Sequence, residues 1–170
     1  MKLFTGKVGI ISAEITKKLV DEGDLETDSP GEVELDVQAV LKEYIRTDRD
    51  LTETAKDICE KKGMSFSSYP KIKRKLAEQR RFITGDEAVD YIMEQLIRTF
   101  MNSQFVEEIF SEDHELKRKM RTVLKHHTEI EDEIDEETRA KIKNLEEGTK
   151  DWEIEYAKAM AQVKRRRGLI

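Results

Sequence analysis

The sequence predicts an all-α protein, and three observations carry that prediction. Apolar side chains recur at helical spacing, as in Val33, Val37, Leu41 and Tyr44, and strand-like alternation is nowhere sustained. Two prolines and eight glycines are the strong helix breakers in 170 residues, which suits helices joined by short turns. Charged residues reach 40% and aromatic residues only 6%, so we expect an aliphatic core beneath ion-paired surfaces, as in proteins from hot environments.

Start and stop signals divide the chain into eight predicted helices. Ser29, Pro30 and Glu32 have the pattern of an N-cap, a first-turn proline and a capping-box partner, and Thr84 with Glu87 repeats it. Glycines suited to C-terminal stops follow three of the helical runs, at Gly23, Gly63 and Gly148. The predicted helices cover residues 7–22, 30–46, 51–62, 69–81, 85–103, 113–127, 134–146 and 150–166.

The two halves of the sequence resemble each other at an offset of 83 residues. The segment VLKEYIRTDRDLTE (Val40–Glu53) aligns with VLKHHTEIEDEIDE (Val123–Glu136), and Tyr69 falls on Trp152. The first helices of the two halves also correspond, with the offset slipping by one. We therefore predict a tandem duplication.

Each predicted copy is a small unit of about four helices. The first copy spans residues 1–83 and the second spans residues 84–170. Half of the chain is a reasonable size for a small helical domain. We expect the two copies to share an interface, with a pseudo-two-fold axis as the simplest relation between them.

Motifs near the C-terminus carry a family resemblance. They are an acidic EID entry, a KI pair, an EGT turn followed by tryptophan, and a tyrosine-containing helix ending in Arg-Arg-Gly, at Glu133–Asp135, Lys141–Ile142, Glu147–Thr149 with Trp152, and Tyr156 with Arg166–Gly168. This segment resembles the bacterial domain of unknown function 507 family, and the opening MKLFTGKVGIISAEITKKLVDEGDL is similar to the family's start. The first copy departs from the pattern by having Tyr69 in place of the tryptophan. The resemblance implies a fold relative and no reaction.

The stretch KHHTEIEDEIDEE, Lys125–Glu137, raises the question of a metal centre, because histidine and carboxylates bind transition metals. No carboxylate lies three residues before any histidine, and adjacent residues of a helix project about 100° apart. At the offset of 83, His126 falls on Glu43 and His127 on Tyr44. We therefore expect His127 on the apolar stripe and His126 facing water, with no metal and no cofactor.

The seven carboxylates of the same stretch have a structural interpretation. Ile130 and Ile134 interrupt them at core spacing. We expect Asp135, Glu136 and Glu137 to occupy the first turn of a new helix, where the helix dipole stabilises each negative charge by about 0.3–1 kcal/mol.

Two residues that occur once each are predicted to be structural. Cys59 falls on the apolar side of a predicted helix, so we expect a small buried hydrophobe and not a nucleophile. A single cysteine excludes an internal disulfide and a cysteine-rich zinc site. Trp152 begins a striped helix and is interpreted as a core anchor.

Basic segments close both predicted copies. The candidate contacts to nucleic acid or other anions are Lys71, Lys73, Arg74, Lys75, Arg80, Arg81, Lys164, Arg165, Arg166 and Arg167. The helix dipole alone favours basic residues at helix C-termini, without any ligand, and the same residues could pair with acidic turns of a neighbouring copy or subunit. No aromatic stacking platform accompanies them, so any nucleic acid would be held by its phosphates.

These observations favour a non-catalytic binding or assembly module over an enzyme. Its expected partner is an unidentified protein or a second copy of the chain; the alternatives are nucleic acid bound through the basic helix ends and, least favoured, a metal-dependent enzyme. The chain has no phosphate-binding glycine loop, nucleophile elbow or HExxH motif. The net charge of −6 excludes a uniformly basic nucleic-acid binder and leaves a local basic face open. No long apolar run predicts a signal peptide or a membrane span, so we expect a cytoplasmic protein.

Overall fold

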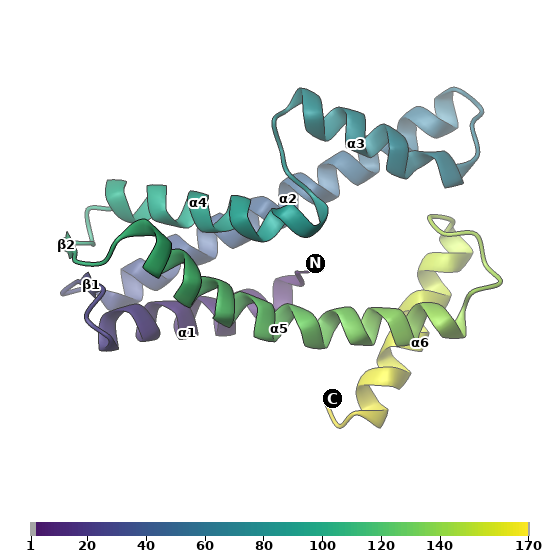
Figure 1. The fold of residues 1–170 in the computed structure, drawn as a ribbon. Coiled ribbons are helices and arrows are strands. Elements are labelled where there is room, and N and C mark those ends of the chain that lie inside the picture. Colours follow the sequence, from purple (N-terminus) through teal and green to yellow (C-terminus); the bar gives the residue numbers. More distant parts are fainter. Residues whose placement is uncertain (1–2, 170) are drawn as a thin grey trace. The chain divides into compact units, whose positions relative to one another are not determined.

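The computed structural model describes residues 3–169 and is all-α within them. Two two-residue strands, β1 (Leu25–Glu26) and β2 (Glu108–Ile109), form one antiparallel pair. The helices of the described residues are α1 (Val8–Asp21), α2 (Pro30–Lys61), α3 (Tyr69–Gln79), α4 (Ala88–Asn102), α5 (Asp113–Lys141) and α6 (Lys150–Arg166) (Figure 1). The predicted fold class is therefore confirmed.

Two of the predicted helix breaks are absent. The helices expected at 30–46 and 51–62 form one helix of 32 residues, α2, and those expected at 113–127 and 134–146 join in α5. Neither junction contains proline or glycine. The buried stripe of α2 also continues in phase across its junction, from Tyr44 to Leu51 and Ala55. Turn-forming Asp and Thr residues do not end a helix whose apolar face is buried on both sides of them.

The chain folds into two compact units, each built from separated segments. Unit 1 contains the described residues up to Thr47 together with Ile83–Glu129, and unit 2 contains Asp48–Phe82 together with the described residues from Ile130 onward. Because α2 and α5 each begin in unit 1 and end in unit 2, each unit takes one part of each predicted repeat. The boundary between residues 83 and 84 thus describes a repeat of the sequence, which stays a prediction, and it is not where the compact units divide.

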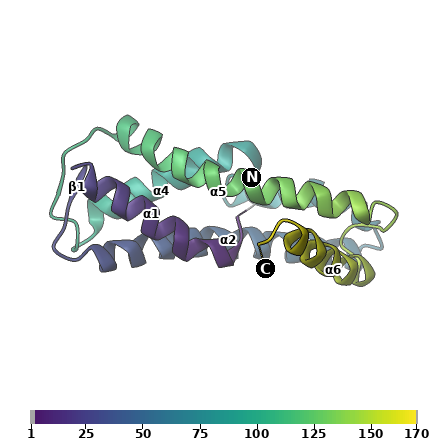
Figure 2. The same cartoon turned by 90° about the horizontal axis from the view of Figure 1, so that it is seen from below.

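Unit 1 has an aliphatic core. It packs α1 and α4 with the N-terminal parts of α2 and α5, which Figure 2 shows from below. Its fully buried large side chains are Ile11, Ile15, Leu19, Leu41, Ile92, Met93, Leu96, Phe100, Leu116, Met120 and Leu124. Burying one such side chain contributes about 1.5–3 kcal/mol, so this set supplies most of the apolar driving force for unit 1.

Unit 2 has a core of smaller side chains. It packs α3 and α6 with the C-terminal parts of α2 and α5. The buried side chains there are Leu51, Ala55, Cys59, Ala77, Phe82, Glu131, Ile134, Thr138, Ala159 and Val163. Cys59 is fully buried, as the sequence predicted.

The pattern of buried positions in α1 is repeated in α4. All six buried residues of α1 fall on buried residues of α4 at an offset of 81, as Ile11 does on Ile92 and Ile15 on Leu96. The offset between α1 and α4 is therefore 81, which is two residues less than the offset of 83 found elsewhere, whereas the sequence suggested a difference of one. The strand pairing is symmetric at the offset of 83, because Leu25 pairs with Ile109 and Glu26 with Glu108. At this offset Leu25 corresponds to Glu108 and Glu26 to Ile109, so replacing each residue by the corresponding one gives the same two pairs.

Candidate functional site

The basic end of α6 is closed by carboxylates of α5, which lies beside it in Figure 2. Arg167 donates from Nη1 to Glu133 Oε2 at 2.9 Å and from Nη2 to Glu137 Oε1 at 2.8 Å. Arg166 donates to the other oxygen of Glu137 at 2.5 Å. The hydrogen bond from Arg167 holds the pKa of Glu137 below its ordinary value. Two of the predicted anion contacts on α6 therefore already have anionic partners within the chain.

The remaining candidate contacts of α6 divide between a paired and an exposed side chain. Lys164 Nζ lies 3.8 Å from an oxygen of the buried Glu131. Arg165 is exposed and makes no ion pair within residues 3–169. Of the four basic residues at this helix end, Arg165 alone is left open among the described residues.

The acidic run of α5 does not begin a helix. Asp135 and Glu137 lie more than twenty residues after the start of α5 at Asp113, far from the N-terminal turn where the dipole would stabilise them. The prediction of a first-turn role is wrong. These carboxylates are instead stabilised by basic side chains, Asp135 by Arg139 and Glu137 by Arg167.

By comparison, most basic residues along α3 and in the turn after it have no acidic partner among the described residues. Lys73 pairs with Asp48 at 2.7 Å. The other predicted contacts are exposed and, across residues 3–169, make no ion pair: Lys71, Arg74, Lys75, Arg80 and Arg81. Lys71, Arg74 and Lys75 follow i, i+3, i+4 spacing, which places them on one helix face. We call the five open residues the α3 basic face.

Local sequence explains why one helix end is closed and the other is open. α6 has 17 residues and α3 has 11, so α6 continues by one and a half further turns that carry its terminal arginines. The acidic run of α5 also has a poorer counterpart on α2. At the offset of 83, Glu137 falls on Thr54, so the carboxylate that binds both Arg166 and Arg167 has no equivalent there.

The helix that carries the α3 basic face ends in a left-handed turn. Arg81 has φ of 54°, the one positive φ at a non-glycine position in the described chain. The amide of Arg81 donates to the Glu78 carbonyl at 3.1 Å and that of Phe82 to the Ala77 carbonyl at 2.9 Å. This pair of bonds is a Schellman motif. The buried Phe82 anchors the turn, which fixes where Arg80 and Arg81 leave the helix.

The two adjacent histidines lie in different surroundings. His127 Nε2 lies 2.6 Å from Glu14 Oε2 of α1, while His126 is exposed. The positions that the offset predicted for both rings are confirmed. Among residues 3–169, no group of three or more His, Cys, Asp or Glu side chains is arranged to hold a metal ion. His127 packs α5 against α1 instead.

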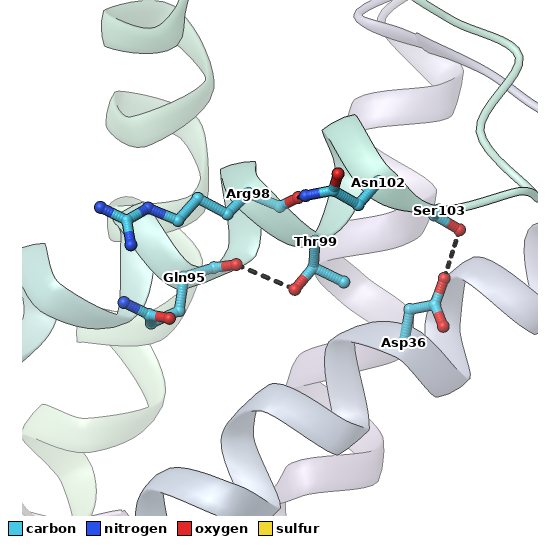
Figure 3. Close-up of a pocket in the computed structure, with 6 residues that line it drawn as sticks. All are labelled: Asp36, Gln95, Arg98, Thr99, Asn102 and Ser103. Carbon is cyan, nitrogen blue, oxygen red and sulfur yellow. Dashed lines mark hydrogen bonds between the residues drawn. The ribbon is translucent and has the colours of Figure 1, made fainter.

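A polar hollow in unit 1 is a second candidate site (Figure 3). Its lining residues are Asp36, Gln95, Arg98, Thr99, Asn102 and Ser103. Ser103 donates to Asp36 at 2.5 Å, and Thr99 and Asn102 donate to the carbonyls of Gln95 and Arg98 in their own helix. No histidine or lysine lines the hollow to act as a base for the serine, as nucleophilic catalysis would require. The bond from Ser103 to Asp36 instead ties the residue after α4 to α2.

An arginine-centred cluster lies in unit 2. Arg139 donates to Asp135 at 2.8 Å and lies 2.8 Å from Glu147. Its guanidinium carbon is 5.3 Å from the centroid of the Trp152 ring and 5.9 Å from that of Tyr156, and the two rings are stacked. The Tyr156 hydroxyl donates to Asp135. Burial lowers the pKa of Arg139, but its hydrogen bonds to Glu147 and Asp135 outweigh burial and raise it.

Tyr69 brings the first half of the chain into the same cluster. Its hydroxyl donates to Glu147 at 3.3 Å, and Lys56 Nζ lies 5.6 Å from its ring centroid. Gly148 has φ of 90°, and a Cβ there would lie 3.4 Å from the Tyr69 ring. Burial, with the Glu147 charge second, raises the pKa of Tyr69 to about 12. The phenol therefore stays protonated at neutral pH and acts as a hydrogen-bond donor.

Gly148 is not the helix stop that the sequence predicted. α5 ends at Lys141, and Gly148 lies in the turn that leads into α6. Its positive φ of 90° is what favours glycine there, because side chains of other residues rarely adopt that conformation. Thr149, the next residue, caps α6 by accepting a hydrogen bond from the Trp152 amide.

The family model described as "Protein of unknown function (DUF507)" matches residues 1–169. The chain belongs to the DUF507 family. This confirms the resemblance seen in the sequence, and it carries no activity to transfer. No curated protein matches the chain.

The DUF507 motifs converge in unit 2. Asp135 of the EID entry, Glu147 of the EGT turn, Trp152 and Tyr156 all contact Arg139 or its partners. Arg167 of the C-terminal Arg-Arg-Gly pairs with Glu133 of the EID entry. The motifs therefore act together to join α5, the following turn and α6. Tyr69, the residue that falls on Trp152 at the offset of 83, donates a hydrogen bond to Glu147 of the EGT turn.

Sequence reasoning missed Arg139, the centre of this cluster. The residue stands in the segment RAKIK, where it reads as one more surface cation. Its signal was spacing, because Asp135 precedes it by one helical turn. Trp152 was predicted to be a core anchor, and it is half-buried with Arg139 against its ring. In the described part of the chain, no helix is long and apolar enough to cross a membrane.

Proposed function

We propose that this DUF507 protein is a non-catalytic binding module that takes an anionic partner on the α3 basic face. The observation that carries the proposal is the difference between the two basic helix ends. The end of α6 pairs with Glu131, Glu133 and Glu137, whereas the five cations of the α3 basic face, which lie along α3 and in the turn after it, have no acidic partner among the described residues. An exposed group of like charges raises the local concentration of oppositely charged partners.

The proposed binding surface rests on a well-fixed base. Lys73 on the opposite side of α3 pairs with Asp48 of α2, and Ala77 is buried. At the N-terminal end of the helix, Tyr69 is held by Glu147 and Gly148. A surface whose backbone is already ordered loses less conformational entropy when a partner binds.

We also propose that the chain arose by tandem duplication of a unit of about half its length. The element order of a helix, a short strand, a long helix and a further helix occurs twice. The coincidence of buried positions in α1 and α4 and the symmetric strand register support the same proposal. Superposition of the two halves in an experimental structure tests it: Cα atoms at offsets of 81 and 83 should coincide.

The binding proposal is tested by affinity capture from native cell extract. The protein with Lys71→Glu, Arg74→Glu and Lys75→Glu should lose the partners that the unchanged protein retains. A matched control reverses three other exposed lysines of unit 2, Lys141, Lys143 and Lys150, with the same change in net charge. Circular dichroism checks that each variant folds.

The control variant separates a local surface from a general charge effect. Loss of partners in the α3 variant alone supports the proposal. Equal loss in both variants, or retention in both, contradicts it. Self-association, the other form of assembly expected from the sequence, is read from sedimentation of the purified protein: a dimer abolished by the α3 substitutions would replace the anionic partner by a second copy of the chain.

A further inference from the structure

We propose that the partner of the α3 basic face is the phosphate backbone of nucleic acid, bound without reading its sequence. This inference rests on the proposed function and names the class of partner. It does not extend to the basic end of α6, although the sequence treats the two ends as equivalent.

Positive charge is concentrated around α3 in an otherwise acidic protein. From Lys61 to Arg81 the chain has eight Lys and Arg residues and one acidic residue, Glu78. Unit 1 as a whole has 12 basic against 20 acidic residues, whereas unit 2 has 19 against 17. A polyanion is therefore repelled by the charge of unit 1 and attracted at α3, which restricts where it can bind.

The spacing of the cations suits a chain of phosphates. Lys71, Arg74 and Lys75 lie within little more than one helical turn on one exposed face, and neighbours at this spacing have Cβ atoms about 5–6 Å apart. Arg80 and Arg81 follow in the fixed turn after the helix. The face has three arginines beside two lysines, which suits phosphate recognition because each guanidinium can bind two phosphate oxygens at once.

The α3 basic face itself has no exposed apolar anchor of the kind that protein partners use. The nearest exposed large apolar side chains along the chain are Met64 and Ile83, at the two edges of this segment. Protein–protein interfaces are depleted in lysine at their centres and are built around aromatic and aliphatic anchors. Interfaces with nucleic acid are more polar and much more positively charged. This difference favours nucleic acid over an acidic protein as the partner.

The aromatic residues nearby are not available for base stacking. Tyr69 is half-buried, with Lys56 against its ring and Glu147 on its hydroxyl. Phe66 is half-buried in the preceding turn. Without a stacking platform or a helix face that presents amide side chains to base edges, binding should depend on phosphate charge and not on base sequence.

The experiment is fluorescence anisotropy with four labelled probes: a mixed-sequence single-stranded RNA, a second RNA of unrelated sequence, a DNA duplex, and a poly-glutamate peptide. The two RNAs should bind with equal affinity, and poly-glutamate should bind far more weakly. Three to five phosphate contacts predict that affinity falls between 50 and 200 mM salt by about 20- to 130-fold for the single-stranded RNAs and by about 40- to 500-fold for the DNA duplex. Lys71→Glu, Arg74→Glu and Lys75→Glu together should abolish binding, and the Lys141, Lys143 and Lys150 control should retain most of it.

The outcomes distinguish this inference from the proposed function. If poly-glutamate binds in an α3-dependent way and no nucleic acid does, the nucleic-acid inference fails and the binding module stands. If none of the four probes binds at 50 mM salt, and the α3 variant keeps its partners from extract, both fail. A strong preference for one RNA over the other contradicts backbone binding. A milder variant with glutamine at the same three positions guards against misfolding and should weaken binding at least tenfold.

Discussion

Each of the two compact units is stabilised internally, and the two differ in the side chains that they bury. Eleven of the twelve largest fully buried side chains belong to unit 1, and the twelfth, Leu51, belongs to unit 2. Unit 1 is therefore stabilised mainly by burial of aliphatic surface. Unit 2 buries fewer large apolar side chains, and beside its small core lies the half-buried cluster of Arg139, Trp152, Tyr156 and their carboxylate partners. The two units therefore differ in how much aliphatic surface they bury.

Both units contain linked ion pairs. In unit 1, Lys119 pairs with Glu22 and with the buried Asp24, beside exposed pairs such as Lys17 with Asp21 that contribute little. In unit 2 the pairs are linked, because Arg139 and Arg167 each contact two carboxylates. A linked network fixes geometry more than isolated pairs do. In unit 2 these links order the end of α6, whereas the α3 basic face has no such partners among the described residues.

The largest effect should come from the core of unit 1. Phe100→Ala removes a side chain that is 1% exposed and should lower the free energy of unfolding by about 3–5 kcal/mol. Cys59→Ala in unit 2 removes one buried sulfur and should cost about 1 kcal/mol. Urea unfolding followed by circular dichroism measures both. Costs of equal size would contradict the view that the two cores differ.

The stability of unit 2 should depend instead on Arg139. Arg139→Met keeps an apolar stem but leaves Asp135 and Glu147 without their shared cation, and should cost about 1–2 kcal/mol, a figure reduced for partial exposure to solvent. Trp152 is the single tryptophan of the chain, so its fluorescence reports on this cluster. Its emission should shift to longer wavelength as the guanidinium is lost.

Arg139→Lys is the matched substitution. Lysine keeps the charge but cannot donate to two carboxylates in the planar geometry of arginine, so it should recover less than half of the lost stability. Full recovery would mean that charge alone matters and that the stacking on Trp152 and Tyr156 contributes nothing.

Tyr69 predicts how unit 2 responds to alkaline pH. Its pKa is raised to about 12 in the folded protein, against about 10 in the unfolded chain. Between these values the unfolded state has lost the phenolic proton and the folded state retains it, so the stabilisation present below pH 10 is lost as pH rises to 12. The stability difference between the unchanged protein and Tyr69→Phe should therefore shrink across this interval. A difference that stays constant with pH would show that the phenol titrates normally.

Local pattern predicted the fold class and most buried positions, because burial on a helix follows a period that is written in the sequence. It placed Cys59 in the core, and it placed His127 on the apolar stripe of its own helix. The two long helices were missed because segments such as TDRD resemble turns when read alone. What keeps α2 helical there is the burial of Tyr44 and Leu51 on either side, which depends on packing partners elsewhere in the chain.

The surface charges were harder to assign for the same reason. Glu137 obeys a local rule for helix starts, yet its partners Arg166 and Arg167 lie 29 and 30 residues away. Tyr69 and Glu147 are separated by 78 residues. The sequence could name the ten basic residues, but only the three-dimensional arrangement separates the cations that are paired from those that are open.

The smallest change in stability, and the sharpest test of the comparison between helix ends, should come from opening the closed end. Glu133→Gln with Glu137→Gln removes the carboxylates that hold Arg166 and Arg167 while keeping side-chain size. Because both carboxylates are at the surface, the melting temperature should change little. The freed arginines should add a second basic surface, so RNA affinity should rise and its dependence on salt should steepen by about one to two phosphate contacts. Glu153→Gln, which removes the carboxylate that pairs with Lys56, is the control. It should leave both the RNA affinity and its dependence on salt unchanged. If the double variant binds RNA no better than this control, pairing with α5 is not what keeps the end of α6 from binding.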